Sequence, residues 1–457
     1  MKKKRLLDRA YLPSGELRLT DLMKSSGFRK YLANTSWMMG EKSIRLGINL
    51  IIGIIIARYL GPRDYGLLAY AISFVSIFGV MSSLGFQDVL IRELIKERDK
   101  REELLGTTFL LRLAGACLLL LTVAIISLMV FPDKSSITMV MIVASSHIFL
   151  SFNVIESFFE SKVKARISSR SLLIALLGSS VFKIILVMIS ATVVCFAFSM
   201  LVESMILSIC LVAFYHADGN SVLDWKFLRG RAISLLSDSW PLAVAWLFAM
   251  AYTRVDQIMI KYLLGNQELG YYAVAVSMTE AWTVLPAVIT ASFFPAIIYA
   301  KRRGESLYKF RMQRLFTLLV WISIFISVPI SLFSKPIIFY LFGDSYSNSS
   351  EVLSVLIWSS VPIFIGIVNG KWIVAENLQR IWLIINPIGM FLNVALNLIF
   401  IPKYGNIGAA YTTVLTQIVI AHIVFIFWNR TIDLYRFHHA SLVAPFFFLK
   451  KQLLFKD

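Results

Sequence analysis

Residues 107–131 read TTFLLRLAGACLLLLTVAIISLMVF, a stretch with one charged side chain. The hydrocarbon core of a bilayer is ~30 Å thick, and roughly 20 apolar residues of α-helix cross it. Similar stretches recur along the 457-residue chain, which is 58% hydrophobic and 16% charged, whereas soluble domains carry about 25% charged residues. The alternating ten-residue segments of an outer-membrane barrel are absent. The sequence therefore predicts an all-α polytopic membrane protein.

Short polar segments separate these stretches, and the pattern predicts about twelve transmembrane helices. The ends of each predicted span are defined to within about four residues. The predicted spans are 37–58, 66–90, 107–131, 137–159, 171–189, 191–214, 239–263, 271–300, 315–334, 351–375, 380–401 and 406–429.

Lysine and arginine are divided very unequally between the two sides of the predicted membrane. Of 45 such residues, 33 fall on the side of the N-terminus, five on the opposite side and seven within the spans. The positive-inside rule then places both termini in the cytoplasm of a multi-pass protein of the bacterial inner membrane. This topology, together with attraction to anionic lipids, accounts for the net charge of +18. We therefore expect no nucleic-acid partner.

The chain contains an internal repeat on either side of a polar stretch at 215–238. Residues 61–73 read GPRDYGLLAYAIS, and residues 265–277 read GNQELGYYAVAVS. At an offset of 204, two glycines, an acidic residue, two alanines and a serine coincide. Parallel repeats of this kind are related by an axis along the membrane normal, and they are typical of transporters with a site between the halves. The repeat predicts two six-helix lobes related by a pseudo-two-fold axis.

The repeat also predicts where the chain divides. The expected parts are a cytoplasmic basic segment (1–36), an N-terminal lobe (37–214), a cytoplasmic linker (215–238), a C-terminal lobe (239–430) and a cytoplasmic or interfacial tail (431–457).

Several short motifs, in this order and spacing, resemble those of the polysaccharide-biosynthesis flippases of O-antigen type. These flippases belong to the multidrug/oligosaccharidyl-lipid/polysaccharide exporter superfamily. The motifs are RYLGPRDYG at 58–66, LGF at 84–86, IREL at 91–94, FFESK at 158–162, RVDQIM at 254–259, GYYA at 270–273, FP at 294–295, Asn393, Asn397, and YGNIGAA at 404–410.

The resemblance implies two lobes that enclose a polar cavity, with no catalytic activity and no cofactor. It also implies movement of an undecaprenyl-pyrophosphate-linked oligosaccharide from the cytoplasmic to the periplasmic leaflet. Membrane lipids and other polysaccharide-assembly membrane proteins are the further partners expected. Lipid II flippases of the superfamily usually have fourteen spans, so about twelve favours the O-antigen or capsule branch.

Charges at membrane depth are the candidate site residues. A charge at the centre of a helix costs about 2.5–3.5 kcal/mol on insertion scales, so it should face a cavity or a partner. The first span carries Glu41, Lys42 and Arg45. Arg45 lies one helical turn from Glu41, so it either pairs with this acid or contacts the diphosphate, which suits a guanidinium.

Further candidates are spread over later spans. Each charged one could be an interhelical pair instead of a functional group, and the asparagine could serve helix packing. The full set of cavity candidates is Lys42, Arg45, Arg254, Asp256, Lys371 and Asn393, and the ion-coupling candidates are Glu41, Glu203, Asp256 and Glu280. No metal-ligand spacing is present.

Two other function classes compete with the flippase. The first is a multidrug or cation exporter of the same fold, which would favour an acidic cavity. The second is a membrane-embedded glycosyltransferase or polymerase, but the longest predicted outer loop, at about 335–350, is short for one. The sequence carries no ATP-binding loop, so an ion gradient, the membrane potential or removal of product would supply the energy.

Overall fold

The computed structural model describes the backbone of residues 26–130 and 134–454, and in these residues all regular structure is helical. The predicted basic segment 1–36 therefore falls mostly outside the described residues. Short 3₁₀ turns join several of the helices. The α-helices are α3 (Ser26–Phe78), α4 (Val80–Ser83), α5 (Phe86–Lys96), α6 (Arg101–Val130), α7 (Lys134–Leu150), α8 (Val154–Ser161), α9 (Ala165–Met188), α10 (Val193–Ala217), α11 (Arg229–Leu264), α12 (Asn266–Glu280), α13 (Val284–Arg303), α14 (Glu305–Leu332), α15 (Ser334–Phe342), α16 (Ser349–Leu356), α17 (Ser360–Ala375), α18 (Trp382–Ala421) and α19 (Ile432–Leu454).

Ten helical stretches of the described chain are long and apolar enough to cross a membrane, so the protein is a multi-pass membrane protein. The number differs from the predicted twelve because two pairs of predicted spans run together. The stretches Gly40–Phe78 and Gln379–Phe427 are 39 and 49 residues long. Each contains one glycine with non-helical backbone angles, Gly61 (φ 71°, ψ 171°) and Gly405 (φ 66°, ψ −148°). A positive φ at a glycine costs little, so the chain reverses there without a loop.

Other predicted spans are continuous in sequence but broken in the structure. Residues 271–300 divide between α12 and α13, and residues 351–375 divide between α16 and α17. The predicted linker 215–238 is also shorter than expected, because α10 runs to Ala217 and α11 already begins at Arg229. Polar residues in the first turns of α11 resemble a loop in sequence, although they lie on a helix.

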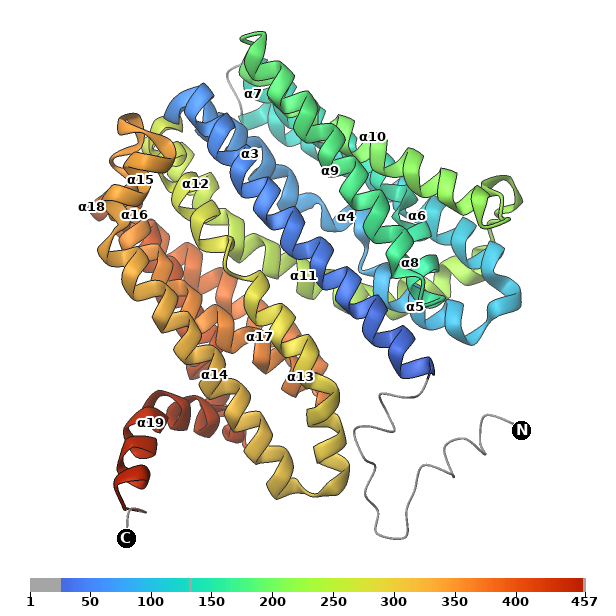
Figure 1. The fold of residues 1–457 in the computed structure, drawn as a ribbon. Coiled ribbons are helices and arrows are strands. Elements are labelled where there is room, and N and C mark those ends of the chain that lie inside the picture. Colours follow the sequence, from blue (N-terminus) through green and yellow to red (C-terminus); the bar gives the residue numbers. More distant parts are fainter. Residues whose placement is uncertain (1–25, 131–133, 455–457) are drawn as a thin grey trace, which may run out of the picture.

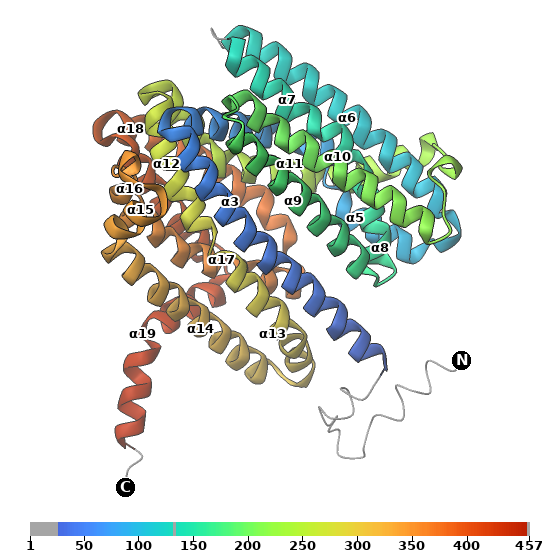
Figure 2. The ribbon, with the colours of Figure 1, turned by 45° about the horizontal axis from the view of Figure 1, so that its top comes forward.

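The helices form two groups with α3 between them (Figure 1). Helices α6, α7, α9 and α10 lie on one side, and α12 to α18 lie on the other; the view in Figure 2 agrees. Helix α3 packs against α9 and α7 of the first group and against α12 of the second. Helix α11 crosses between the groups and packs against α18, α3 and α6. Helix α3, which contains the first repeat hairpin, and helix α11, which ends just before the second, thus join the two groups.

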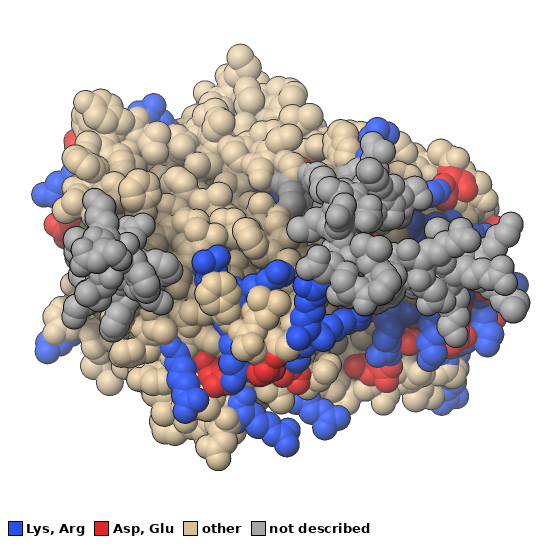
Figure 3. All heavy atoms as spheres, turned by 60° about the horizontal axis from the view of Figure 1, so that its bottom comes forward, with Lys and Arg blue, Asp and Glu red and all other residues tan. Residues whose placement is uncertain are grey.

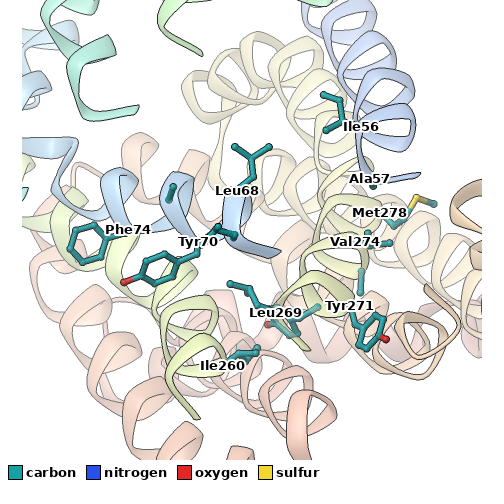
Figure 4. Packing of buried hydrophobic residues seen from close by; sticks show 14 of the residues in the cluster. Ile56, Ala57, Leu68, Tyr70, Phe74, Ile260, Leu269, Tyr271, Val274 and Met278 are labelled. Atoms are coloured by element: carbon teal, nitrogen blue, oxygen red, sulfur yellow. The ribbon is translucent and has the colours of Figure 1, made fainter. Parts of the chain in front are cut away.

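The two repeat hairpins pack directly against each other. A Cβ atom added at Gly66 would lie 1.9 Å from the carbonyl oxygen of Asn266, and one added at Gly270 would lie 1.9 Å from the carbonyl oxygen of Pro62. The contact is reciprocal. In the repeat, Pro62 is equivalent to Asn266 and Gly66 is equivalent to Gly270, and each glycine contacts the residue equivalent to the other's partner. Buried apolar residues of both hairpins and of the adjoining turns of α3, α11 and α12 form one cluster, part of which is labelled in Figure 4. Only a residue without a side chain allows this approach of two backbones.

The opposite end of the molecule is basic. Lysine and arginine side chains gather over the face that Figure 3 brings forward, which is the lower face of Figure 1. Ion pairs hold the loops of this face together. Arg231 of α11 donates to Glu97 before α6, with its Nη1 atom 2.9 Å from Oε1. Hydrogen bonds from Arg231 lower the pKa of Glu97 from 4.5 to about 2.

Candidate substrate cavity

A cavity of about 1330 Å³ lies between the two groups of helices. Residues of α3, α11, α12, α13, α17 and α18 line it, and the side of the first group contributes Asp88 of α5, a helix that packs against α8 and α6. It also reaches Gln379 and Arg380, which precede α18 at the basic face. Small-molecule sites are commonly about 300–1,000 Å³, so this cavity has room for a large polar headgroup.

Basic side chains dominate the charge of the cavity wall. Its charged residues are Lys42, Arg45, Arg254, Lys371 and Arg380, with Asp88 and Glu280 as the acidic ones. Two of the five basic residues are paired. The Arg254 guanidinium is 3.2 Å from the Glu280 carboxylate, and the Arg45 Nε atom is 3.1 Å from the Glu41 carboxylate. Among the described residues, the other three basic side chains form no ion pair, so the cavity presents uncompensated positive charge.

The rest of the wall is largely apolar and aromatic. Helix α11 contributes Trp246 and Tyr252, helix α18 contributes Trp382 and Leu383, and helix α17 contributes Ile367. Gly366 and Gly370 of α17 also line the cavity, so their lack of side chains leaves space next to Lys371. An apolar wall lowers the local dielectric and strengthens the interaction of the cations with an anion.

Two predicted cavity residues are not in this wall. Asp256 is 3% exposed and accepts hydrogen bonds from the Tyr272 hydroxyl, the Gln257 amide (2.8 Å) and the Thr413 hydroxyl (3.3 Å). Asn393 is 1% exposed and accepts from the Asn397 side chain at 2.8 Å. Asp256 thus joins α11 to α12 and α18, whereas the hydrogen bond of Asn393 lies within α18.

The other candidates lie at a second, smaller cavity of about 480 Å³. Glu41 and Glu203 are in its wall, together with Lys42 and Arg45, which line both cavities. The Glu203 carboxylate is 3.3 Å from the Lys183 ammonium and accepts from the Ser179 hydroxyl at 2.8 Å. The structure thus separates the predicted acids: Glu41 and Glu203 are here, Glu280 is in the main cavity, and Asp256 is in neither.

Sequence reasoning missed four residues of these sites. Glu156 and Glu160 of α8 line the smaller cavity, and Arg380 lines the main one. Asp88 of α5 also lines the main cavity. Asp88, Arg380 and Glu160 lie near the ends of predicted spans, where charges usually indicate a loop. Glu156 is a charge within a predicted span, and this signal could have found it.

Comparison with known proteins gives a consistent result. The sequence profile of a family described as "polysaccharide biosynthesis protein" matches residues 55–351. The chain is 26% identical over 194 residues to the capsular polysaccharide biosynthesis protein CapF of Staphylococcus aureus, covering 42% of this chain and 48% of that protein. It is 30% identical over 198 residues to the probable flippase AglR of Haloferax volcanii, covering 41% of this chain and 40% of that protein. The matches therefore span less than half of these two relatives.

A longer match is to a putative O-antigen transporter of Shigella flexneri, 22% identical over 393 residues, or 83% of this chain and 93% of that protein. Solved structures share the fold. An inward-facing multidrug transporter aligns with a TM-score of 0.70 over 87% of this chain and 96% of that chain, at 16% identity. The lipid II flippase MurJ aligns with 0.66 over 91% and 92%, also at 16% identity. The profile match covers more than half of the residues, and the chain belongs to the polysaccharide biosynthesis protein family.

Proposed function

We propose that the protein is a flippase that moves an undecaprenyl-pyrophosphate-linked oligosaccharide from the cytoplasmic to the periplasmic leaflet of the inner membrane. The product would serve the synthesis of O-antigen or capsular polysaccharide. The names of the relatives, which include a probable flippase and a putative O-antigen transporter, support this class of activity.

The observation that carries the proposal is the basic cavity between the helix groups. Lys42, Lys371 and Arg380 form no ion pair among the described residues although they line a largely apolar space. Holding a charge in a membrane is costly, and an anion between these side chains would offset the cost. A diphosphate is doubly charged or more, and it accepts short charge-assisted hydrogen bonds.

The same observation disfavours export of cationic compounds. An exporter of cations would present more carboxylates than basic groups, whereas the main cavity has two acidic and five basic residues. One of the two acids, Glu280, is already paired with Arg254. The family fold alone does not distinguish the two activities, and the charge of the cavity is the observation that favours the flippase.

Alternating access would move the lipid headgroup across. In this proposal Gly61 and Gly405 each separate two spans, which gives twelve, and the lobes are 37–214 and 239–430, with both termini cytoplasmic. The reciprocal contact of Gly66 and Gly270 supports a two-fold relation between the lobes. The cavity would then be open toward the basic, cytoplasmic face and closed by the hairpins at the outer end.

A deletion strain complemented with charge variants tests the proposal. Lys371→Gln and Lys42→Gln should each lower surface polymer and leave lipid-linked units on the cytoplasmic leaflet. Lys335→Gln is the matched control, because Lys335 is exposed and outside both cavities. Loss of one charge-assisted contact, worth about 1.5–3 kcal/mol, should slow transport at least tenfold. Unchanged polymer in the deletion strain, with new sensitivity to cationic drugs, would favour the exporter instead.

A further inference from the structure

The smaller cavity has a composition unlike that of the main one. It is enclosed by α3, α7, α8, α9 and α10, which belong to the first half of the chain. Its wall contains the carboxylates of Glu156, Glu160 and Glu203, and the side-chain amides of Gln87 and Asn153. Serine hydroxyls of α7, α9 and α10 complete it. Such a wall offers both acceptors and donors at short range, which is the combination that sugar hydroxyls require.

Several of these polar atoms have no hydrogen-bond partner among the residues that the structure describes. The hydroxyl of Ser168, a residue only 3% exposed, makes no hydrogen bond among the described residues. The Oδ1 atom of Asn153 is likewise buried and unpaired. Glu156 forms no ion pair in the described part of the chain, whereas Glu41 and Glu203 each have a basic partner. A buried polar atom without a partner destabilises the folded protein, so these atoms are expected to bond to something that enters the cavity.

The position of the cavity identifies what can enter it. Lys42 and Arg45 line both cavities, so the two cavities adjoin each other at these two side chains. If the diphosphate is held by these side chains, the sugar directly attached to it is within reach of the smaller cavity. The polyprenyl chain, which is apolar, would face the aromatic wall of the main cavity and the lipid.

We propose that the smaller cavity binds the first sugars of the transported unit and that its carboxylates favour neutral or amino sugars over acidic ones. The inference rests on the proposed flippase function. Selection follows from charge, because a uronic acid placed beside Glu156 and Glu160 would bring like charges together. Hydroxyl and acetamido groups would instead donate to these carboxylates and to the Asn153 Oδ1 atom, and accept from the Ser168 hydroxyl.

The test compares three synthetic lipids on purified protein in nanodiscs. They are undecaprenyl pyrophosphate without sugar, the same lipid carrying one N-acetylglucosamine, and the same lipid carrying one glucuronic acid. The quantity measured is the ratio of the Kd of the bare lipid to the Kd of each sugar-bearing lipid. Two additional hydrogen bonds predict a ratio of about 5–150-fold for N-acetylglucosamine. The ratio for glucuronic acid should be near one or below.

Two variants separate the smaller cavity from the rest of the site. Glu156→Gln and Ser168→Ala should each reduce the N-acetylglucosamine ratio about threefold or more, and Glu156→Gln should raise the ratio for glucuronic acid. Glu351→Gln is the matched control, because Glu351 is exposed and lines neither cavity. Ser168→Ala removes a single oxygen, so it remains informative if the charge variant folds poorly.

The possible results are distinct. Failure of the wild type to bind the bare lipid would contradict the proposed function itself. Binding of the bare lipid with ratios that the two variants do not change would overturn the sugar site alone. Ratios that stay constant while sodium or pH dependence of lipid binding changes in Glu156→Gln would assign the cavity to a coupling cation, and would also overturn it.

Discussion

Alanine at Gly66 or Gly270 should force the outer ends of the two helix groups apart. Each added Cβ would lie 1.9 Å from a backbone carbonyl oxygen of the opposite hairpin, and ordinary contact begins at 3.4 Å. The hairpins must therefore separate by about 1.5 Å, because neither atom belongs to a side chain that could rotate away. Overpacking of this kind costs about 1–3 kcal/mol.

This cost falls only on conformations in which the hairpins touch. A conformation open at the outer end keeps them apart and is not affected. A difference of 1–3 kcal/mol changes the ratio of the two states about 5–150-fold in favour of the outward-open one. The double variant should show the larger effect, although the two contacts are neighbours and their costs need not add.

Cysteine accessibility measures the shift. The assay uses protein in which the three native cysteines, Cys117, Cys195 and Cys210, are replaced by serine. Ser73 is 2% exposed and donates to Gln257 at 2.6 Å between α3 and α11. In Gly66→Ala, a Ser73→Cys site should react faster with an impermeant maleimide added from outside.

An inner site and a control variant complete the design. Ala249 lines the main cavity, and an Ala249→Cys site should react more slowly from the cytoplasmic side in the same variant. Gly53→Ala is the matched control, because a Cβ at Gly53 of the same helix meets nothing within 4 Å. Unchanged rates at both sites, or a rise at both, would refute the reasoning, since a rise at both indicates unfolding instead of a shift between conformations.

Three further predictions follow from the charges. If Arg45 contacts substrate and not only Glu41, then Arg45→Ala and the Glu41→Ala/Arg45→Ala double variant should both lose surface polymer at normal expression, whereas an active double variant would make the pair structural. Reporter fusions should place the C-terminus in the cytoplasm and Lys134 in the periplasm, and a periplasmic C-terminus would contradict the two-lobe topology. The ion pair of Arg231 and Glu97 stabilises the folded state fully above about pH 4.5 and loses this contribution as the pH falls toward 2. In the Glu97→Gln variant, the dependence of Tm on pH between these values should be weaker when measured in detergent. An unchanged slope would argue against the pair.

Much of the fold could be predicted because the membrane imposes simple rules. The apolar stretches of the sequence coincide with the ten long apolar helical stretches of the described chain, although two of these each combine two predicted spans. The repeat at 61–73 and 265–277 also identified the two segments whose glycines meet in the structure. The continuous paths through Gly61 and Gly405 could not be predicted, since a glycine that reverses the chain without a loop has the same sequence pattern as one within a short loop.

The site was predictable only in part. Lys42, Arg45, Arg254, Lys371 and Glu280 carry charges whose cost in a membrane requires a cavity or a partner, and all five line the main cavity. Asp256 and Asn393 were also predicted to line the cavity but are buried outside it: Asp256 accepts hydrogen bonds from α12 and α18, and Asn393 accepts one from Asn397 of its own helix. Which of the two outcomes a buried polar residue has depends on the packing of helices distant in sequence, and a single sequence does not contain this information.

Direct measurement of transport tests the central claim. Purified protein is reconstituted into liposomes with undecaprenyl pyrophosphate that carries a fluorescent N-acetylglucosamine on both leaflets, and a membrane-impermeant reductant quenches the outer leaflet. Flipping predicts that quenching exceeds half of the signal with the wild type, and that it stays near half with empty liposomes and with Lys42→Gln/Lys371→Gln. Quenching that stays near half with folded wild-type protein, with and without an ion gradient, would contradict the account.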